Sequence, residues 1–143
     1  MPETPVPMIL ALLLSGGLFG SMLFFAVVTA PTVFKALPED QAGRFLRELF
    51  PRYYTWGMIV SFLAAVACVF LDRMDLVLTT LVFVLFVLAR QVLMPRINTR
   101  RDAALAGDKA AAKQFLRLHG LSVLINLVQM IILLAVFAHV GLY

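Results

Sequence analysis

Long apolar stretches alternate with short polar segments along the whole chain. Leu, Val, Ile, Phe and Ala dominate the stretches, and Pro, Asp, Arg and Lys residues are concentrated between them. A helix needs about 20 mainly apolar residues to cross the hydrocarbon core of a bilayer. The pattern therefore predicts four membrane-spanning helices, at residues 8–34, 53–71, 76–94 and 116–140.

A shorter amphipathic segment, residues 39–50, separates the first two predicted spans. Its apolar residues share one helical face, and they are Ala42, Phe45, Leu46, Leu49 and Phe50. Such a helix typically lies in the membrane interface. We therefore predict an all-α fold with a single domain, residues 1–143. It is an integral membrane four-helix bundle with an interfacial amphipathic helix between the first and second spans.

The connections between the spans have their own patterns. Residues 72–75 are too few for anything but a tight turn between antiparallel helices. Pro31 is expected to bend the first span near its end, and Pro95 to bend or open the third without ending it. Gly107-Asp108 is typical of a helix C-cap followed by an N-cap. The third and fourth spans are therefore predicted to form a long hairpin that projects past the bilayer.

Composition and charge support a membrane protein and predict its orientation. Of 143 residues, 62% are hydrophobic and 14% are charged, whereas soluble domains are about half apolar and a quarter charged. Most basic residues form two clusters, Lys35, Arg44, Arg47 and Arg52, and Arg96, Arg100, Arg101, Lys109, Lys113 and Arg117. Positive residues favour the cytoplasm. We therefore predict a multi-pass protein of the inner (cytoplasmic) membrane with both termini outside. The net charge of +4 is too small to indicate a nucleic-acid partner.

A row of uncharged polar residues follows one face of the fourth span. Their spacing is i, i+3, i+7 and i+10, and they are His119, Ser122, Asn126 and Gln129. Unpaired polar groups are costly in lipid, so this face must contact protein, water or a ligand. Antiparallel packing places Arg90 and Gln91 about level with Ser122. We therefore predict a polar cavity that opens to the cytoplasm.

The first two spans are expected to complete the walls of this cavity. Arg52, Tyr53 and Tyr54 begin the second span and would stand at the mouth. Small residues on the first span include a G-x-x-x-G pair, which lets another helix approach closely. These predicted packing residues are Gly16, Gly17, Gly20 and Ser21.

Two interpretations of Arg90 and the polar row remain open. A charge inside the membrane indicates function by default, so the cavity would bind an anionic or strongly hydrogen-bonding small molecule. Alternatively, Arg90 extends its side chain to the membrane surface and the polar row only joins helices. No Asp or Glu falls within any predicted span. This pattern disfavours a carrier coupled to protons or sodium ions.

Residues for catalysis or metal binding are sparse. Cys68 has no second cysteine to pair with, and we expect it to be a buried apolar residue. His119 and His139 lie about 30 Å apart on one helix, so they cannot both ligate one haem or metal. We find no nucleophile with a plausible base, no phosphate loop and no zinc motif. No metal site, no cofactor and no enzymatic activity are therefore predicted, although a haem held by His119 alone remains an alternative.

Three segments resemble a known family. They are LFPRYY at Leu49–Tyr54, MPRINTRRD at Met94–Asp102 and FLRLHGLSVLINL at Phe115–Leu127. They are similar to the transmembrane-protein-205-like family, and the similarity covers nearly the whole chain. More distantly, the architecture resembles the copper-resistance D proteins and the four-helix membrane protoporphyrinogen oxidases. The resemblance implies a four-helix membrane protein that handles or exports metal-containing or other toxic compounds.

Three functional hypotheses follow from the sequence. The leading one is a transporter-like or ligand-binding membrane protein with a cytoplasm-facing polar cavity. It would act as a homo-oligomer, because four helices leave little room for a pathway within one protomer. The alternative is a redox protein that holds haem or quinone, with His119 as the axial ligand. The second alternative is a non-catalytic membrane scaffold in which the polar row only packs helices.

Overall fold

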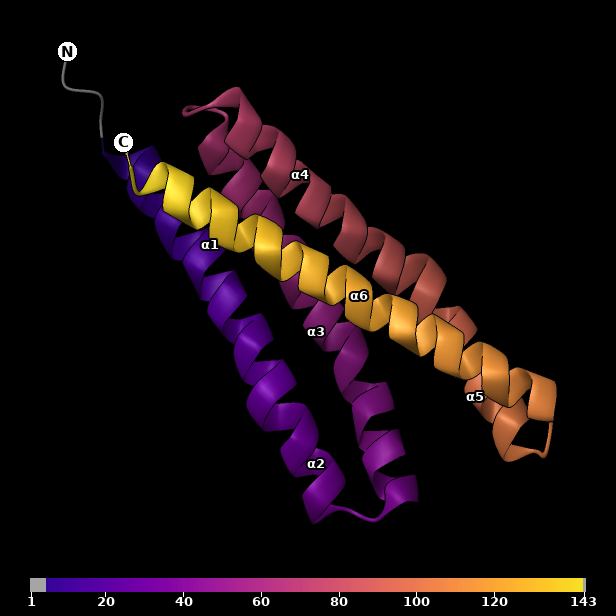
Figure 1. Cartoon of the computed structure of the whole chain (residues 1–143). Helices are drawn as coiled ribbons and strands as arrows, with labels where there is room; N and C mark the ends of the chain where they lie inside the picture. Colours follow the sequence, from indigo (N-terminus) through magenta and orange to yellow (C-terminus); the bar gives the residue numbers. More distant parts are fainter. Residues whose placement is uncertain (1–4, 143) are drawn as a thin grey trace.

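The computed structural model describes residues 5–142, which are helical almost throughout and contain no strand (Figure 1). These residues form four long helical rods. Two rods consist of an α-helix, a π-helical turn and a second α-helix, and two are single α-helices. In chain order the elements are α1 (Val6–Phe24), η1 (Phe25–Thr29) and α2 (Ala30–Ala36); α3 (Glu39–Cys68); α4 (Arg73–Leu88), η2 (Ala89–Leu93) and α5 (Met94–Leu105); and α6 (Lys109–Val140).

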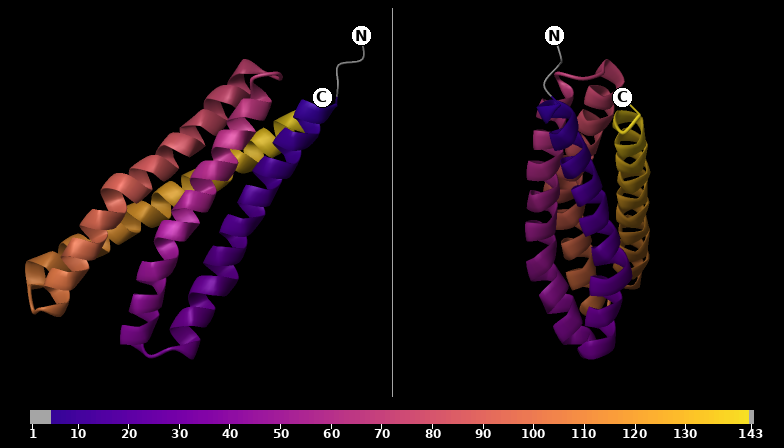
Figure 2. Two further views of the ribbon diagram at one scale, coloured as in Figure 1. Left: turned by 180° about the vertical axis from the view of Figure 1, so that it is seen from behind. Right: turned by 90° about the vertical axis from the view of Figure 1, so that its left-hand side faces the viewer.

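The four rods form two antiparallel hairpins. The first rod pairs with α3, and the third rod pairs with α6. Helix α1 also packs against α6, and α3 packs against α4, which closes a four-helix bundle. The described chain ends and the α3–α4 turn lie together at one end, and the two hairpins diverge toward the other end (Figures 1 and 2). The predicted topology also places both termini and the connection between the second and third spans on one side of the membrane. Which side that is stays a prediction.

Three of the rods are long and apolar enough to cross a membrane. They are Val6–Ala36, Arg73–Leu105 and Lys109–Val140. Many of their large apolar side chains are exposed, as expected for surfaces that face lipid rather than water. Helix α3 has a charged first half and an apolar second half. The three apolar rods indicate a membrane protein, whereas a crossing by residues 53–71 stays a prediction.

Helix α3 differs from the predicted pair of elements. Residues 39–50 and 53–71 were expected to form an interfacial helix and a separate span, but one helix runs from Glu39 through Pro51 to Cys68. The same helical face is buried on both sides of the proline, with Leu46 before it and Tyr54 after it. Packing along this face outweighs the backbone bond that Pro51 cannot make.

Each of the two π-helical turns ends two residues before a proline. Turn η1 precedes Pro31, and turn η2 precedes Pro95. A proline ring clashes with the carbonyl group one turn earlier, and a wider turn gives that carbonyl group room. Helix α5 continues beyond Pro95 to Leu105. This confirms that Pro95 opens the helix locally without ending it.

The α5–α6 turn agrees with the predicted caps. Gly107 has a φ of 100°, a conformation that glycine adopts without strain. The Asp108 carboxylate accepts a hydrogen bond from the backbone nitrogen of Ala111 at 3.1 Å. Because the turn is short, α5 and the first half of α6 lie side by side (Figures 1 and 2).

Glycine packing differs from the prediction for the first span. Gly16 lies against the Phe137 ring, but a Cβ atom at Gly17 or Gly20 would meet no other atom within 4 Å. Gly57 on α3 is packed more tightly, because an added Cβ there would overlap the ring of Phe86 on α4. Gly57 therefore sets how closely α3 packs against α4.

Candidate functional site

An aromatic and polar centre lies where α3, α4 and α6 meet. The Tyr53 hydroxyl group donates a hydrogen bond to Asn126 Oδ1 at 2.7 Å. The Tyr53 ring also stacks on Phe25, with ring centroids 4.6 Å apart. The Gln129 side chain is buried and donates to the carbonyl group of Val82 at 3.2 Å. These two bonds join α6 to α3, which lies diagonally across the bundle, and to its neighbour α4.

The predicted polar row on α6 does not share one environment. Asn126 bonds to α3 and Gln129 bonds to α4. The Ser122 hydroxyl group donates to the carbonyl group of His119 on its own helix, at 2.7 Å. His119 is exposed, and its ring stacks on Phe115 with centroids 5.9 Å apart. The row therefore divides between helix packing and the surface, which leaves His119 as an exposed imidazole rather than a buried ligand.

Arg90 is the candidate whose environment most suggests a ligand. It lies within η2, partly buried, and its Nε atom is buried without a hydrogen-bond partner among the described residues. Such atoms are rare because an unmatched polar group loses its water without compensation. Gln91, the next residue, is exposed. The Arg90 guanidinium group can therefore accept an added hydrogen-bonding partner at Nε.

The antiparallel contact between Val82 and Gln129 sets the level of Arg90. Arg90 lies eight residues after Val82, and Leu121 lies eight residues before Gln129. Both helices rise by the same amount per residue, so Arg90 is about level with Leu121. This matches the predicted level beside Ser122.

The predicted mouth residues also separate. Tyr54 is buried and stacks on Phe50, with ring centroids 5.8 Å apart. Arg52 is exposed, and its guanidinium group donates to the backbone carbonyl of Glu48 on its own helix at 2.8 Å. Tyr53 is the member of this group that contacts the polar row, through Asn126.

A charged cavity lies farther along the bundle, where the two hairpins diverge. Its volume is about 730 Å³, and α3, α5 and the start of α6 line it. The lining residues are Glu39, Asp40, Gly43, Arg44, Arg47, Arg101, Asp102, Ala104, Leu105 and Phe115. The polar space at the basic end of the molecule is therefore formed by these residues rather than by the polar row. Sequence periodicity could not find it, because it depends on the separation of two hairpins.

Two contacts bridge this hairpin cavity. Arg47 donates two hydrogen bonds to the Asp102 carboxylate, at 2.7 and 2.8 Å. Nη1 of Arg101 donates to the carbonyl group of Gly43 at 3.2 Å. Arg47 and Asp102 are both well exposed, so their bond joins the hairpins reversibly.

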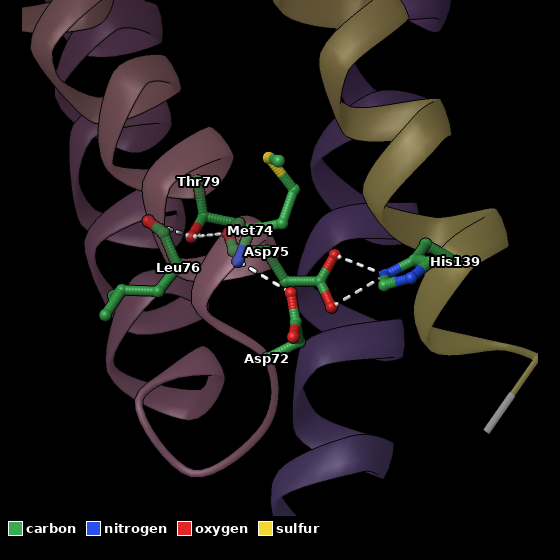
Figure 3. A network of polar contacts seen from close by, with 6 residues as sticks. All are labelled: Asp72, Met74, Asp75, Leu76, Thr79 and His139. Atoms are coloured by element: carbon green, nitrogen blue, oxygen red, sulfur yellow. Dashed lines mark hydrogen bonds and ion pairs between the residues drawn. The ribbon is translucent and has the colours of Figure 1, made fainter.

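A second site, at the opposite end of the bundle, was missed in the sequence. Asp75 of α4 is fully buried, and its two carboxylate oxygens lie 3.0 and 3.1 Å from Nδ1 of His139 on α6 (Figure 3). Asp75 was assigned to a turn, and no partner was predicted for His139. The predicted turn is wrong for Asp75, which lies in the first turn of α4, at the start of the apolar rod Arg73–Leu105.

The helix boundary explains this correction. The Asp72 carboxylate accepts a hydrogen bond from the backbone nitrogen of Met74 at 2.6 Å, so α4 begins at Arg73 and includes Asp75 in its first turn (Figure 3). An acidic N-cap followed three residues later by another acid resembles a capping box. That pattern, Asp72-Arg73-Met74-Asp75, was the available signal.

The described residues offer little for a metal. They contain no group of three or more His, Cys, Asp or Glu side chains that could hold an ion. His119 and His139 occupy different parts of α6, and His139 contacts Asp75. A haem would therefore have to bind His119 at an exposed position beside Phe115.

Comparison with known proteins finds two similarities, and neither carries a described function. The family described as "Domain of unknown function (DUF4149)" matches residues 13–106. A protein of Aquifex aeolicus (strain VF5), described as "Uncharacterized protein", is 32% identical over 119 residues. That alignment covers 82% of this chain and 84% of the Aquifex protein. No solved structure matches the chain.

Proposed function

The chain belongs to the DUF4149 family, and we propose that it is a transporter-like, ligand-binding membrane protein whose polar site opens where its two hairpins diverge. The observation that carries this proposal is the hairpin cavity, which the Arg47–Asp102 ion pair bridges from one hairpin to the other. A rigid bundle gains little from a charged gap at one end. A protein that admits a ligand between two hairpins needs such a gap and a weak bridge across it.

We propose that Arg90, which does not line the hairpin cavity, supplies a separate contact for the ligand on η2. Its buried Nε atom is an unsatisfied donor, and a guanidinium group binds carboxylate and phosphate groups with directed hydrogen bonds. An anionic or strongly hydrogen-bonding small molecule is therefore the proposed ligand class. Following the positive-inside rule, we propose that this end faces the cytoplasm. Both termini would then lie on the opposite, outer side of the inner membrane. Assembly into a homo-oligomer is part of the proposal, because one four-helix protomer is narrow for a pathway.

The sequence resemblance to the transmembrane-protein-205-like family adds a narrower proposal. It suggests metal-containing or other toxic compounds as cargo, exported from the cytoplasm. The support for this cargo is the similarity of the segments at Leu49–Tyr54, Met94–Asp102 and Phe115–Leu127. A platinum-containing drug is therefore one suitable probe beside simple organic anions.

Spin labels can test whether the hairpins separate. Labels at Gln41 of α3 and Leu105 of α5, both exposed, report the distance across the hairpin cavity by double electron–electron resonance. The buried Cys68 is replaced by alanine so that labelling is confined to the two sites. We expect Arg47→Gln to increase the population at longer distances by up to about fivefold, because an exposed ion pair is worth at most about 1 kcal/mol.

The matched control for this experiment is Arg44→Gln. Arg44 pairs with Asp40 on the same helix, at 2.8 Å, so its loss should leave the distance between the hairpins unchanged. One narrow distance distribution, identical in all three proteins and unaffected by reconstitution into a bilayer, would contradict the transporter-like proposal. That result would favour the scaffold hypothesis.

Ligand binding is tested separately through Arg90. Benzoate, salicylate, octanesulfonate and a platinum-containing drug are screened by their effect on the thermal unfolding midpoint in detergent. A compound that stabilises the wild-type protein should lose this effect in Arg90→Ala, while the midpoint without ligand changes little. Arg73→Ala is the control, because Arg73 is exposed at the other end of the third rod. An equal ligand response in Arg90→Ala and wild type would remove Arg90 from the site.

A further inference from the structure

A second hollow lies between α5 and α6, and its lining is strongly basic. Its volume is about 510 Å³. Three arginines line it together with four uncharged residues, and no acidic residue lines it. The lining residues are Pro95, Arg96, Thr99, Arg100, Gln114, Arg117 and Leu118. This basic hollow is separate from the hairpin cavity, with which it shares no lining residue.

Helix geometry brings the three guanidinium groups together. Arg96 and Arg100 are four residues apart and therefore share one face of α5. Arg117 follows Gln114 by three residues on the facing side of α6. The short α5–α6 turn at Gly107 fixes the antiparallel register that places these faces opposite each other. Three positive charges on two facing helices repel one another unless an anion lies between them.

The three arginines have no partner in the part of the chain that the structure describes. No ion pair or side-chain hydrogen bond links any of them to another residue there. Arg47, by contrast, is matched by Asp102, and Arg44 by Asp40. A guanidinium group presents paired donors that fit two oxygens of a phosphate. The hollow therefore has the charge and the donors for a phosphate group.

The position of the hollow identifies the source of the phosphate. Arg96 lies two residues after the predicted end of the third span, and Arg117 lies at the predicted start of the fourth. One turn farther into the bilayer, the same two faces continue with the exposed apolar residues Val92 and Leu121. A free phosphate ion would contact only the arginines and would leave the apolar surface of Val92 and Leu121 uncovered. A phospholipid would place its headgroup on the arginines and its acyl chains along the apolar surface.

We propose that the basic hollow between α5 and α6 binds the headgroup phosphate of an anionic phospholipid in the cytoplasmic leaflet. Basic pockets on the cytoplasmic side of membrane helices recognise such headgroups. Binding fixes α5 against α6 at the membrane surface. This site does not depend on the ligand proposed for the hairpin cavity, because the two hollows have different linings.

The test is a lipid titration of the full chain in detergent micelles. The reported quantity is the mole fraction of lipid that gives half of the maximal rise in thermal unfolding midpoint. Phosphatidylglycerol should stabilise the wild-type protein, and phosphatidylcholine and millimolar inorganic phosphate should have little effect. Arg117→Gln and Arg100→Gln should each raise the required mole fraction of phosphatidylglycerol about fivefold. Lys35→Gln, which removes one positive charge outside both hollows, should leave it unchanged.

Three results would overturn the proposal. Equal stabilisation by phosphatidylglycerol and phosphatidylcholine would exclude recognition of an anionic headgroup. Equal stabilisation by inorganic phosphate would assign the hollow to a free anion. Equal weakening in Lys35→Gln and Arg117→Gln would indicate general surface charge instead of a site. All variants replace exposed side chains, so the unfolding transition itself reports whether each protein is folded. The spin-label distances across the hairpin cavity are measured independently, so either proposal can fail alone.

Discussion

Gly57→Ala is expected to lower the free energy of unfolding by about 2 kcal/mol. The added methyl group would overlap the ring of Phe86, which is fully buried in the core between α3 and α4. The ring cannot leave this position without displacing its neighbours, so the two helices must separate. Alanine improves helix propensity by about 1 kcal/mol over glycine, and the overlap outweighs this gain. Unfolding of the purified protein by sodium dodecyl sulfate measures the difference.

Gly17→Ala is the matched control for this prediction. Gly17 also lies within a long helix, but no atom of another described helix lies within 4 Å of its Cβ position. The helix-propensity gain should therefore appear alone, as an increase in stability of up to about 1 kcal/mol. If both variants change stability by the same amount, the close approach of α3 and α4 at Gly57 does not constrain the bundle.

His139→Ala is expected to destabilise the protein by about 2–3 kcal/mol. The imidazole ring contacts both oxygens of the Asp75 carboxylate, which is fully buried. Without the ring, the Asp75 carboxylate stays buried and loses an interaction that offsets the free-energy cost of removing it from water. Asp75→Asn should cost less, because the His139 side chain is about half exposed, at 51%, and water can hydrate it. The unfolding midpoints of the two single variants give this asymmetry directly.

The double variant Asp75→Asn/His139→Ala completes a thermodynamic cycle. We expect it to be less destabilised than the sum of the two single variants, because the first substitution already removes the interaction. Strict additivity would show that the two side chains do not interact in the folded protein. His119→Ala serves as the control on the same helix, since His119 is exposed and should change stability by less than about 0.5 kcal/mol.

The helices themselves follow from the sequence with few exceptions. Apolar runs identify three rods that are long enough to cross a membrane. Local chemistry also identifies the α5–α6 turn, because only glycine readily adopts the positive φ of Gly107 and Asp108 is a good N-cap. These features depend on a few neighbouring residues, which is why they can be predicted without the rest of the chain.

Features that depend on packing between distant segments could not be predicted in the same way. Pro51 is a helix breaker by local rules, but α3 continues through it because one face is buried on both sides. Hydropathy placed Asp75 in a turn, although the cap at Asp72 starts the helix earlier. In both cases the sequence held a relevant signal, and the stronger neighbouring signal concealed it.

The candidate site was predicted least well. The helical spacing of the polar residues correctly places them on one helix, but it does not show which neighbouring helix each side chain contacts. Asn126 meets α3, and Gln129, less than one turn later, meets α4. The two charged hollows depend on where hairpins diverge and on which faces of α5 and α6 oppose each other. Among residues 5–142, only Arg90 has both the predicted level and a buried, unpartnered donor.

The π-helical turn η2 acts as a one-residue insertion in the third rod. An α-helix turns by about 100° for each residue, so one extra residue changes the direction of every side chain beyond it. With this offset, Arg96 and Arg100 line the basic hollow beside α6. A deletion of one residue between Ala89 and Leu93 would rotate both arginines away while leaving their identities intact. The number of residues before Pro95 is therefore as important for the hollow as the arginines themselves. Alignments of related chains should contain no insertion or deletion in this turn.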